Sequence, residues 1–150
     1  MKISDLLDEN LIELDLAGET KEEVLAEMVE LMKKEGKITD KDEFYQTILE
    51  REEEGSTGLG RGVAIPHGKS EVVNELALVF GRSEKGIDFS SRDHKPVNLF
   101  FMVSDYAGHS PEYLEMVAQL TKNVRQDEYR EELLNADSKE EIIEITKKYE

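Results

Sequence analysis

Hydrophobic residues recur along the chain with two different spacings. From Ile12 to Leu16 apolar and acidic residues alternate, which predicts a half-buried strand. After the capping-box pattern Thr20-Lys21-Glu22-Glu23, apolar residues recur at helical spacing until Gly36, which predicts an amphipathic helix. A second helix is predicted from about Thr39 or Asp40 to Gly55, with Phe44 and Ile48 on its inner side and the acidic run 52–54 solvated.

Two continuous apolar runs, 76–80 and 97–103, are rich in β-branched or aromatic residues and predict central strands covered on both faces. The stretch 86–96 between them is polar turn material. Upstream, the glycine-rich segment 55–68 predicts a loop that leads into a short extended piece.

Helical patterns follow the second apolar run. Ser110-Pro111-Glu112 is typical of an N-cap, a proline at the first helical position and an acidic first turn, and it predicts a helix to about Val124. A short helical piece is predicted at 130–134, and Ser138 caps a last helix. We therefore predict one α/β domain over residues 1–150, a three-layer sandwich with a mixed β-sheet flanked by helices.

Composition narrows the function classes. With 19 Lys and Arg against 35 Asp and Glu, the formal charge is −16, which disfavours nonspecific binding to nucleic acid or anionic lipid and hints at a basic protein partner. The absence of cysteine excludes disulfides, thiol nucleophiles and thiolate metal sites. No signal-peptide pattern and no apolar stretch of 18 residues occurs, so we expect a soluble, cytoplasmic protein without membrane insertion.

His67 has the most unusual surroundings of the three histidines. Pro66 before it restricts the backbone, and Gly68 after it removes a side chain, so the imidazole is either presented to a partner or simply closes a turn. The glycine-rich loop adds amides, the Ser56 and Thr57 hydroxyls and a guanidinium such as Arg51 or Arg61, which are groups that stabilise a phosphoryl group. The glycine spacing matches neither the dinucleotide fingerprint nor the P-loop.

The whole segment has a recognisable order. It reads Arg51-Glu52-Glu53-Glu54-Gly55-Ser56-Thr57-Gly58-Leu59-Gly60-Arg61-Gly62-Val63-Ala64-Ile65-Pro66-His67-Gly68. This stretch closely resembles the active-site motif of the EIIA type-2 domains (fructose, mannitol and nitrogen-regulatory classes) of the bacterial phosphoenolpyruvate:sugar phosphotransferase system. The resemblance extends from the first predicted strand to the last helix and includes 86–89 and 96–99.

The resemblance implies a phosphohistidine relay in sugar uptake. His67 would accept a phosphoryl group from the phosphocarrier protein HPr and pass it to a IIB domain, with a membrane IIC domain as a further possible partner. Arg51 would steady the phosphohistidine. Because donor and acceptor are protein groups, the chemistry requires neither a metal nor another cofactor.

The chain departs from the family pattern at one position. The family usually has a second histidine where this sequence has Tyr113, in Tyr113-Leu114-Glu115-Met116-Val117-Ala118-Gln119-Leu120. His109 lies four residues earlier and could take over from the loop; alternatively, Tyr113 packs in the core or the second role is missing. His94 is interpreted as an exposed turn residue.

Two other functions stay open from the sequence. A regulator like the nitrogen-type EIIA proteins would be phosphorylated by the same chemistry but would not pass the group toward sugar. A noncatalytic module using the loop 58–62 would bind phosphate without forming a phosphohistidine. The sequence alone names neither the sugar nor the oligomeric state.

Overall fold

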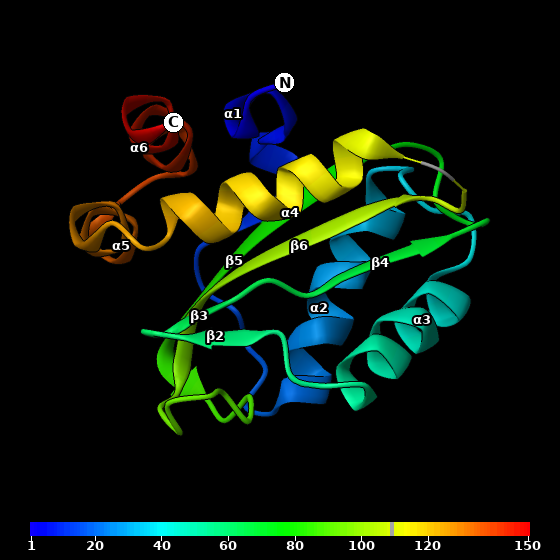
Figure 1. Cartoon of the computed structure of the whole chain (residues 1–150), viewed down its shortest axis with the longest axis horizontal. Helices are drawn as coiled ribbons and strands as arrows, with labels where there is room; N and C mark the ends of the chain where they lie inside the picture. The colour runs from blue at the N-terminus through cyan, green and yellow to red at the C-terminus, as the bar shows by residue number, and fades with distance from the viewer. Residues whose placement is uncertain (109) are drawn as a thin grey trace.

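A mixed sheet forms the centre of the computed structural model, which describes residues 1–108 and 110–150 (Figure 1). Its strands are β1 (Ile12–Glu13), β2 (Gly58–Gly60), β3 (Val63–Ala64), β4 (His67–Ser70), β5 (Ala77–Ile87) and β6 (Val97–Tyr106). The order is β1-β5-β6-β3-β2, and β4 also pairs with β6. The central pair β5 and β6 is antiparallel, while β3 and β4 both run parallel to β6. The predicted mixed sheet is confirmed.

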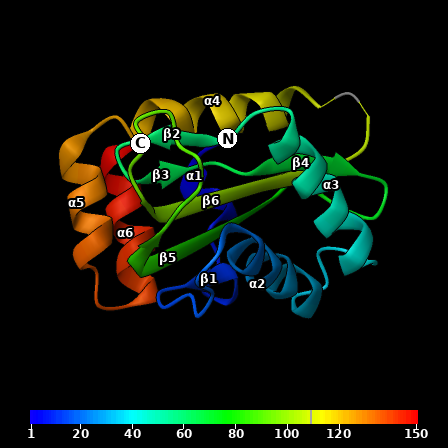
Figure 2. The ribbon, with the colours of Figure 1, turned by 90° about the horizontal axis from the view of Figure 1, so that it is seen from below.

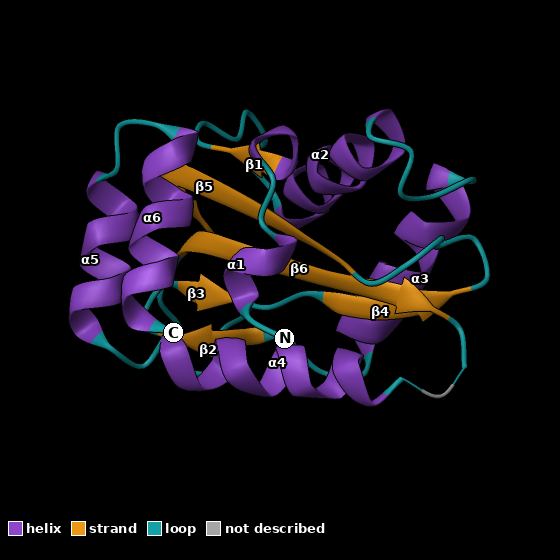
Figure 3. Ribbon diagram, turned by 90° about the horizontal axis from the view of Figure 1, so that it is seen from above, coloured by secondary structure: helices purple, strands orange, loops and turns teal. Residues whose placement is uncertain are grey.

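Helices cover both faces of this sheet. They are α1 (Ile3–Leu6), the 3-10 helix η1 (Glu9–Leu11), α2 (Lys21–Lys34), α3 (Lys41–Glu53), α4 (Pro111–Asn123), α5 (Asp127–Asn135) and α6 (Lys139–Tyr149). Figure 2 shows α4 on one side of the sheet and α2 on the other. In Figure 3, α5 and α6 lie side by side near one end of the sheet, and α3 lies near the other.

The side-chain alternation of β6 explains why its central run from Leu99 to Val103 is apolar at every position. Leu99, Phe101 and Val103 belong to the core beneath α4, α5 and α6, whereas Phe100 and Met102 belong to the core beneath α2 and α3. Because successive residues of a strand point to opposite faces, a strand between two helical layers needs apolar residues at every position. The predicted three-layer α/β arrangement is confirmed.

The predicted helix starts are found at their capping residues. The side chains of Thr20, Asp40, Ser110 and Ser138 each accept a hydrogen bond from a backbone N–H in the first turn of the helix that follows. Helix α5 is longer than the predicted 130–134.

Several short elements differ from the prediction. The strand expected over 12–16 ends at Glu13, because the chain then turns and the Leu16 side chain packs directly against the Gly81 backbone. The segment 55–68 is not simply a loop, since it forms β2, β3 and the start of β4. Helices α1 and η1 were not predicted, because three or four residues are too few to show a helical period.

Arg82 in β5 links the sheet to the end of α5. Its guanidinium donates to the carbonyl oxygens of Leu14 at 3.1 Å, Leu133 at 3.0 Å and Ala136 at 2.7 Å. Arg82→Met would leave these partly buried carbonyls without their donor. We expect the free energy of unfolding to fall by ~2–4 kcal/mol, measured by urea denaturation. An unchanged midpoint and slope would contradict this role, and the exposed Arg92 offers the matched control Arg92→Met.

Candidate functional site

Strand β4 places His67 on the α4 side of the sheet. It pairs in register with β6, His67 opposite Val103 and Gly68 opposite Ser104. Since Val103 belongs to the core beneath α4, the imidazole points to that same side, and Gly68 points toward α3. Figure 1 shows β4 running between these two helices.

Gly68 has a different role from the one its sequence context suggested. A Cβ atom at this position would come within 3.2 Å of side-chain carbons of both Ile48 and Thr47 on α3. The space that a side chain would occupy is therefore filled by α3 and is not open to a partner. Gly68 sets how closely α3 approaches the strand that carries His67.

The imidazole of His67 has one nitrogen engaged. Its Nδ1 lies 2.8 Å from the carbonyl oxygen of Ile65, which can only accept, so Nδ1 carries the proton and donates it. In the neutral ring Nε2 then holds the lone pair. Burial lowers the pKa of His67 below its usual 6.5, opposed by the Ile65 hydrogen bond and reinforced by the positive charge of Arg51. The lowered pKa favours a neutral ring at neutral pH, with the lone pair on Nε2.

Tyr113 packs its ring edge against this imidazole. The two ring centroids are 6.1 Å apart with an interplanar angle of 62°, and Tyr113 is buried. Burial raises the pKa of Tyr113 to about 12, so its hydroxyl stays protonated and can donate a neutral hydrogen bond. Lys69 Nζ lies 5.4 Å from the centroid of the same ring and donates to the Gly108 carbonyl. The half-buried imidazole of His67 is thus packed on one side by Tyr113.

Arg51 lies in the last turn of α3 and supplies the positive charge of the site. One guanidinium nitrogen donates to the Gly55 carbonyl oxygen at 2.9 Å. The arginine charge acts on both site rings, because it lowers the pKa of His67 and also that of Tyr113. The structure therefore brings Arg51, His67 and Tyr113 into one electrostatic neighbourhood.

The two hydroxyls predicted to support a phosphoryl group have partners within the protein. Ser56 donates to the Phe89 carbonyl oxygen at 2.6 Å and accepts from the Gly58 N–H at 3.0 Å. Thr57 is buried and donates both its hydroxyl and its N–H to the carboxylate of Glu52. In this state both residues hold the shape of the loop.

Glu52 is the neighbouring residue that the sequence interpretation missed. The sequence predicts a solvated acidic run here, but Glu52 is buried, whereas Glu53 and Glu54 are exposed. A signal was available, because Glu52 follows Phe44 and Ile48 at intervals of four residues and so shares their inner face of α3. The helical phase of the acidic run therefore places Glu52 on the buried face of α3 and leaves Glu53 and Glu54 in solvent.

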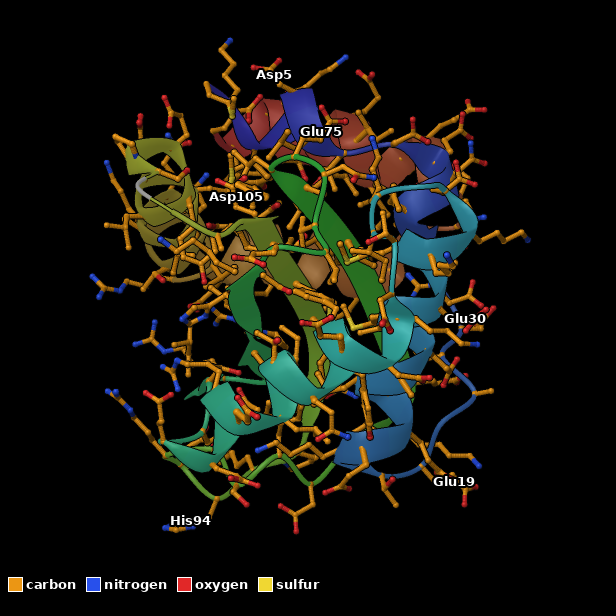
Figure 4. All side chains as sticks on the ribbon, turned by 90° about the vertical axis from the view of Figure 1, so that its right-hand side faces the viewer. Asp5, Glu19, Glu30, Glu75, His94 and Asp105 are labelled. Atoms are coloured by element: carbon orange, nitrogen blue, oxygen red, sulfur yellow. The ribbon has the colours of Figure 1, made fainter. Side chains whose placement is uncertain are left out.

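Arg61, in the same glycine-rich segment, also bonds to other parts of the protein. The Arg61 N–H donates to Asp93 at 2.9 Å, and the Arg61 side chain reaches the Arg125 carbonyl oxygen at 3.4 Å. The predicted exposure of His94 is confirmed: its side chain points away from the body of the protein in Figure 4. His109 lies outside the described residues.

No cluster of three or more metal-ligating side chains occurs in residues 1–108 and 110–150.

The family model described as "Phosphoenolpyruvate-dependent sugar phosphotransferase system, EIIA 2" matches residues 5–149. The chain belongs to this EIIA 2 family. The predicted family membership is thereby confirmed.

Relatives in the EIIA 2 family include both sugar and regulatory proteins. The chain is 39% identical over its full length to a fructose-specific EIIABC component of Bacillus subtilis, of which it spans 24%. It is 34% identical to a fructose-specific EIIA component of Haloferax volcanii, with 95% of this chain and 93% of that protein covered. It is 32% identical to a nitrogen regulatory protein of Bradyrhizobium diazoefficiens, covering 89% of this chain and 86% of that one.

Solved structures give the same result. The crystal structure of the nitrogen regulatory protein IIA-Ntr from Neisseria meningitidis matches with a TM-score of 0.90 and 32% identity, covering 96% of this chain and 98% of that one. The IIA mannitol structure from Escherichia coli matches with a TM-score of 0.78 and 26% identity, over 93% and 98%. The EIIA 2 fold is therefore shared by the sugar and nitrogen-regulatory branches.

Within the described part of the chain, no helix is long and apolar enough to cross a membrane.

Proposed function

We propose that this EIIA 2 domain accepts a phosphoryl group from HPr on Nε2 of His67 and passes it to a IIB domain during sugar uptake. The observation that carries the proposal is the hydrogen bond from Nδ1 of His67 to the Ile65 carbonyl oxygen, which leaves Nε2 with its lone pair. The lowered pKa of His67 keeps that lone pair available at neutral pH. Similarity to the fructose-specific EIIA relatives supports the sugar branch.

The transfer step balances without a cofactor. The Nε2 lone pair of His67 forms an N–P bond as the N–P bond of the donor histidine breaks, and the electron pair of the broken bond stays on the donor nitrogen. A donor ring protonated on its other nitrogen then leaves as neutral imidazole. The proton on Nδ1 of His67 remains hydrogen-bonded to Ile65, which stabilises the positive phosphorylated ring.

Arg51 is proposed to contact the phosphoryl oxygens. A guanidinium offers five N–H donors, so the one bond to Gly55 leaves others for a dianionic group. Ser56 and Thr57 are proposed to act indirectly, by fixing the loop beside His67, since their hydroxyls are engaged with Phe89 and Glu52. IIB partnership also has a parallel in the mannitol system of Escherichia coli, where a IIA–phosphorylated IIB complex has been solved.

The test is stepwise phosphorylation. The protein is incubated with phosphoenolpyruvate, enzyme I and HPr, and its intact mass is measured. One added phosphoryl group, labile in acid and stable in alkali, supports the phosphohistidine, and its loss on adding a fructose-class IIB domain supports the relay. A phosphorylated protein that no IIB domain discharges would contradict the sugar role, and an unphosphorylated one would contradict the whole proposal.

A nitrogen-type regulatory role is the second candidate. The likeness to IIA-Ntr of Neisseria meningitidis, at a TM-score of 0.90, is the observation that favours it. The same His67 chemistry would then change which partner proteins bind. In the experiment above, this role corresponds to stable phosphorylation without transfer to IIB.

The noncatalytic anion-binding alternative receives less support. Its loop amides would have to be free, but the N–H groups of Thr57, Gly58 and Arg61 donate to Glu52, Ser56 and Asp93. Phosphate binding without a covalent phosphohistidine would be its signature.

The pH profile of phosphotransfer tests the substitution at the second-histidine position. With its pKa raised to about 12, Tyr113 stays protonated throughout the neutral range and adds no pH dependence there. Tyr113→Phe is expected to slow transfer roughly 3- to 10-fold by removing one neutral donor, without changing the profile's shape. His109→Gln is the matched variant. If it removes a pH dependence that the parent shows in the neutral range, beyond the acid-side fall that His67 causes, His109 supplies the second histidine. If neither variant has an effect, no second residue takes part.

A further inference from the structure

A hydrogen-bonded chain runs from the start of α2 to the imidazole of His67. Lys21 Nζ lies 2.9 Å from Glu52 Oε1, and the Glu52 carboxylate accepts the Thr57 N–H at 3.1 Å as well as the Thr57 hydroxyl. The Thr57 carbonyl oxygen in turn accepts the Ile65 N–H at 3.1 Å. The Ile65 carbonyl oxygen is the group that accepts Nδ1–H of His67. The buried carboxylate is therefore connected to the proposed nucleophile through hydrogen bonds and the peptide chain.

The burial of this ion pair needs a reason other than stability. The Glu52 side chain is 4% exposed and that of Lys21 is 18% exposed, and Lys21 Nζ also lies 4.4 Å from the centroid of the Phe89 ring. Removing two charges from water costs free energy that their attraction barely repays, so apolar residues of similar size would stabilise the same space as well or better. A carboxylate offers what apolar residues lack, which is directed acceptance of two hydrogen bonds from Thr57.

The turn before His67 is fixed from two sides. The Pro66 carbonyl oxygen accepts the Val103 N–H at 2.9 Å, and the Ile65 N–H is held by Thr57. Pro66 has no N–H of its own, so the bond from Ile65 to Thr57 orients this turn on the side away from β6. If Thr57 moved, the Ile65 peptide would lose that anchor, and its carbonyl oxygen would no longer point at a fixed angle to the imidazole.

We infer that Glu52 is a positioning residue for phosphoryl transfer, which acts through Thr57 and the Ile65 peptide to hold His67 with Nε2 free. Lys21 is the counter-ion of the buried carboxylate. The inference rests on the proposed function of His67 for its effect on rate, but its effect on the imidazole itself can be measured without any transfer.

The charges around His67 determine how its pKa should change when Glu52 is replaced. Arg51 and Glu52 approach from α3, Tyr113 from α4, Lys69 follows on the same strand, and Asp105 in β6 acts on Tyr113. Desolvation is the main cause that lowers the pKa of His67, Arg51 lowers it further, and the negative charge of Glu52 raises it. Removing the Glu52 charge should therefore lower this pKa further.

The experiment compares Glu52→Ala and Glu52→Gln with the control Glu53→Ala, which removes the adjacent exposed carboxylate of the same helix. The readouts are the ¹⁵N chemical shifts of the His67 ring nitrogens, which report the tautomer, its pKa by titration, and the rate of phosphoryl acceptance from HPr. Glu52→Ala should give mixed tautomers, a lower pKa and transfer slowed roughly 10- to 100-fold through misplacement of the nucleophile.

Glu52→Gln keeps an oxygen acceptor for the Thr57 N–H but removes the charge. We expect it to keep the single tautomer, to lower the pKa of His67, and to restore most of the rate lost in Glu52→Ala. Glu53→Ala should match the parent in all readouts. A folded Glu52→Ala protein with the parent's tautomer, pKa and rate would overturn the inference.

A second variant protects the test against misfolding. If Glu52→Ala does not fold, Thr57→Val removes only the hydroxyl link, with Thr57→Ser as its conservative partner. Thr57→Val should perturb the His67 ring signals and Thr57→Ser should leave them unchanged. If Thr57→Val gives the same ring signals as Thr57→Ser and the parent, the inference is also overturned. Failure of HPr to phosphorylate the parent would instead refute the proposed function, while the tautomer data would still decide the role of Glu52.

Discussion

Replacement of His67 by alanine is expected to abolish phosphorylation by HPr while the domain stays folded. His67 supplies the Nε2 lone pair, and Arg51 acts on the same ring. Intact mass after incubation with phosphoenolpyruvate, enzyme I and HPr should show no added phosphoryl group. The half-buried ring packs against Tyr113, so its truncation should lower the free energy of unfolding by ~1 kcal/mol.

His94→Ala is the matched control for this loss. His94 is exposed on the 88–96 loop, so its removal should leave phosphorylation at the parent rate. A His67→Ala protein that still gains one phosphoryl group at an unchanged rate would show that another residue is the nucleophile.

Arg51→Lys is expected to slow phosphoryl transfer about 100-fold while HPr binding changes little. An arginine that stabilises a transferring phosphoryl group can contribute ~10³ or more in rate, and lysine keeps the charge but loses the planar two-donor geometry. Single-turnover rates measured by quenched flow, alongside HPr titrations, separate the two effects. Arg61→Lys is the control, because the Arg61 side chain reaches Arg125 on another part of the surface. Equal rates for Arg51→Lys and the parent would exclude the role.

Removal of the charge at position 51 should shift the pKa of His67 in a defined direction. Because Arg51 lowers the pKa of His67, Arg51→Gln should raise that pKa, whereas Arg51→Lys should leave it nearly unchanged. In the parent, acceptance should be independent of pH above neutrality and should fall on the acid side with a midpoint below 6.5, since protonation removes the Nε2 lone pair.

The longer elements of this fold could be predicted because their residues repeat a pattern several times. Helix α2 shows its apolar stripe over 14 residues, and β6 shows a two-sided core strand. Strands β2 and β3 have three and two residues, too few to show alternation. They pair with each other locally, but β3 joins the sheet only by pairing with β6, whose residues lie far along the chain. The glycines of β2 are typical of a loop in the sequence, because the sheet that β2 joins through β3 forms only in the folded chain.

The candidate site could likewise be predicted only in part. His67 and Arg51 could be named because the motif places them, but their environment depends on the tertiary structure. That Gly68 is covered by Thr47 and Ile48 of α3 follows from packing between helix and strand, which no local pattern shows. The burial of Glu52 was accessible from helical phase, whereas its bonds to Thr57 required the loop conformation.

The contact between α3 and Gly68 affects which step should limit the exchange of phosphoryl groups with partner proteins. Because the helix that carries Arg51 in its last turn rests against the backbone beside the histidine, the spacing between guanidinium and imidazole is set during folding and requires no closure around a substrate. Each exchange of the phosphoryl group should then be limited by how often partner proteins meet in the correct orientation. Turnover should rise with partner concentration and fall with solvent viscosity, and an alanine at Gly68 should change the chemical step while leaving that encounter rate untouched.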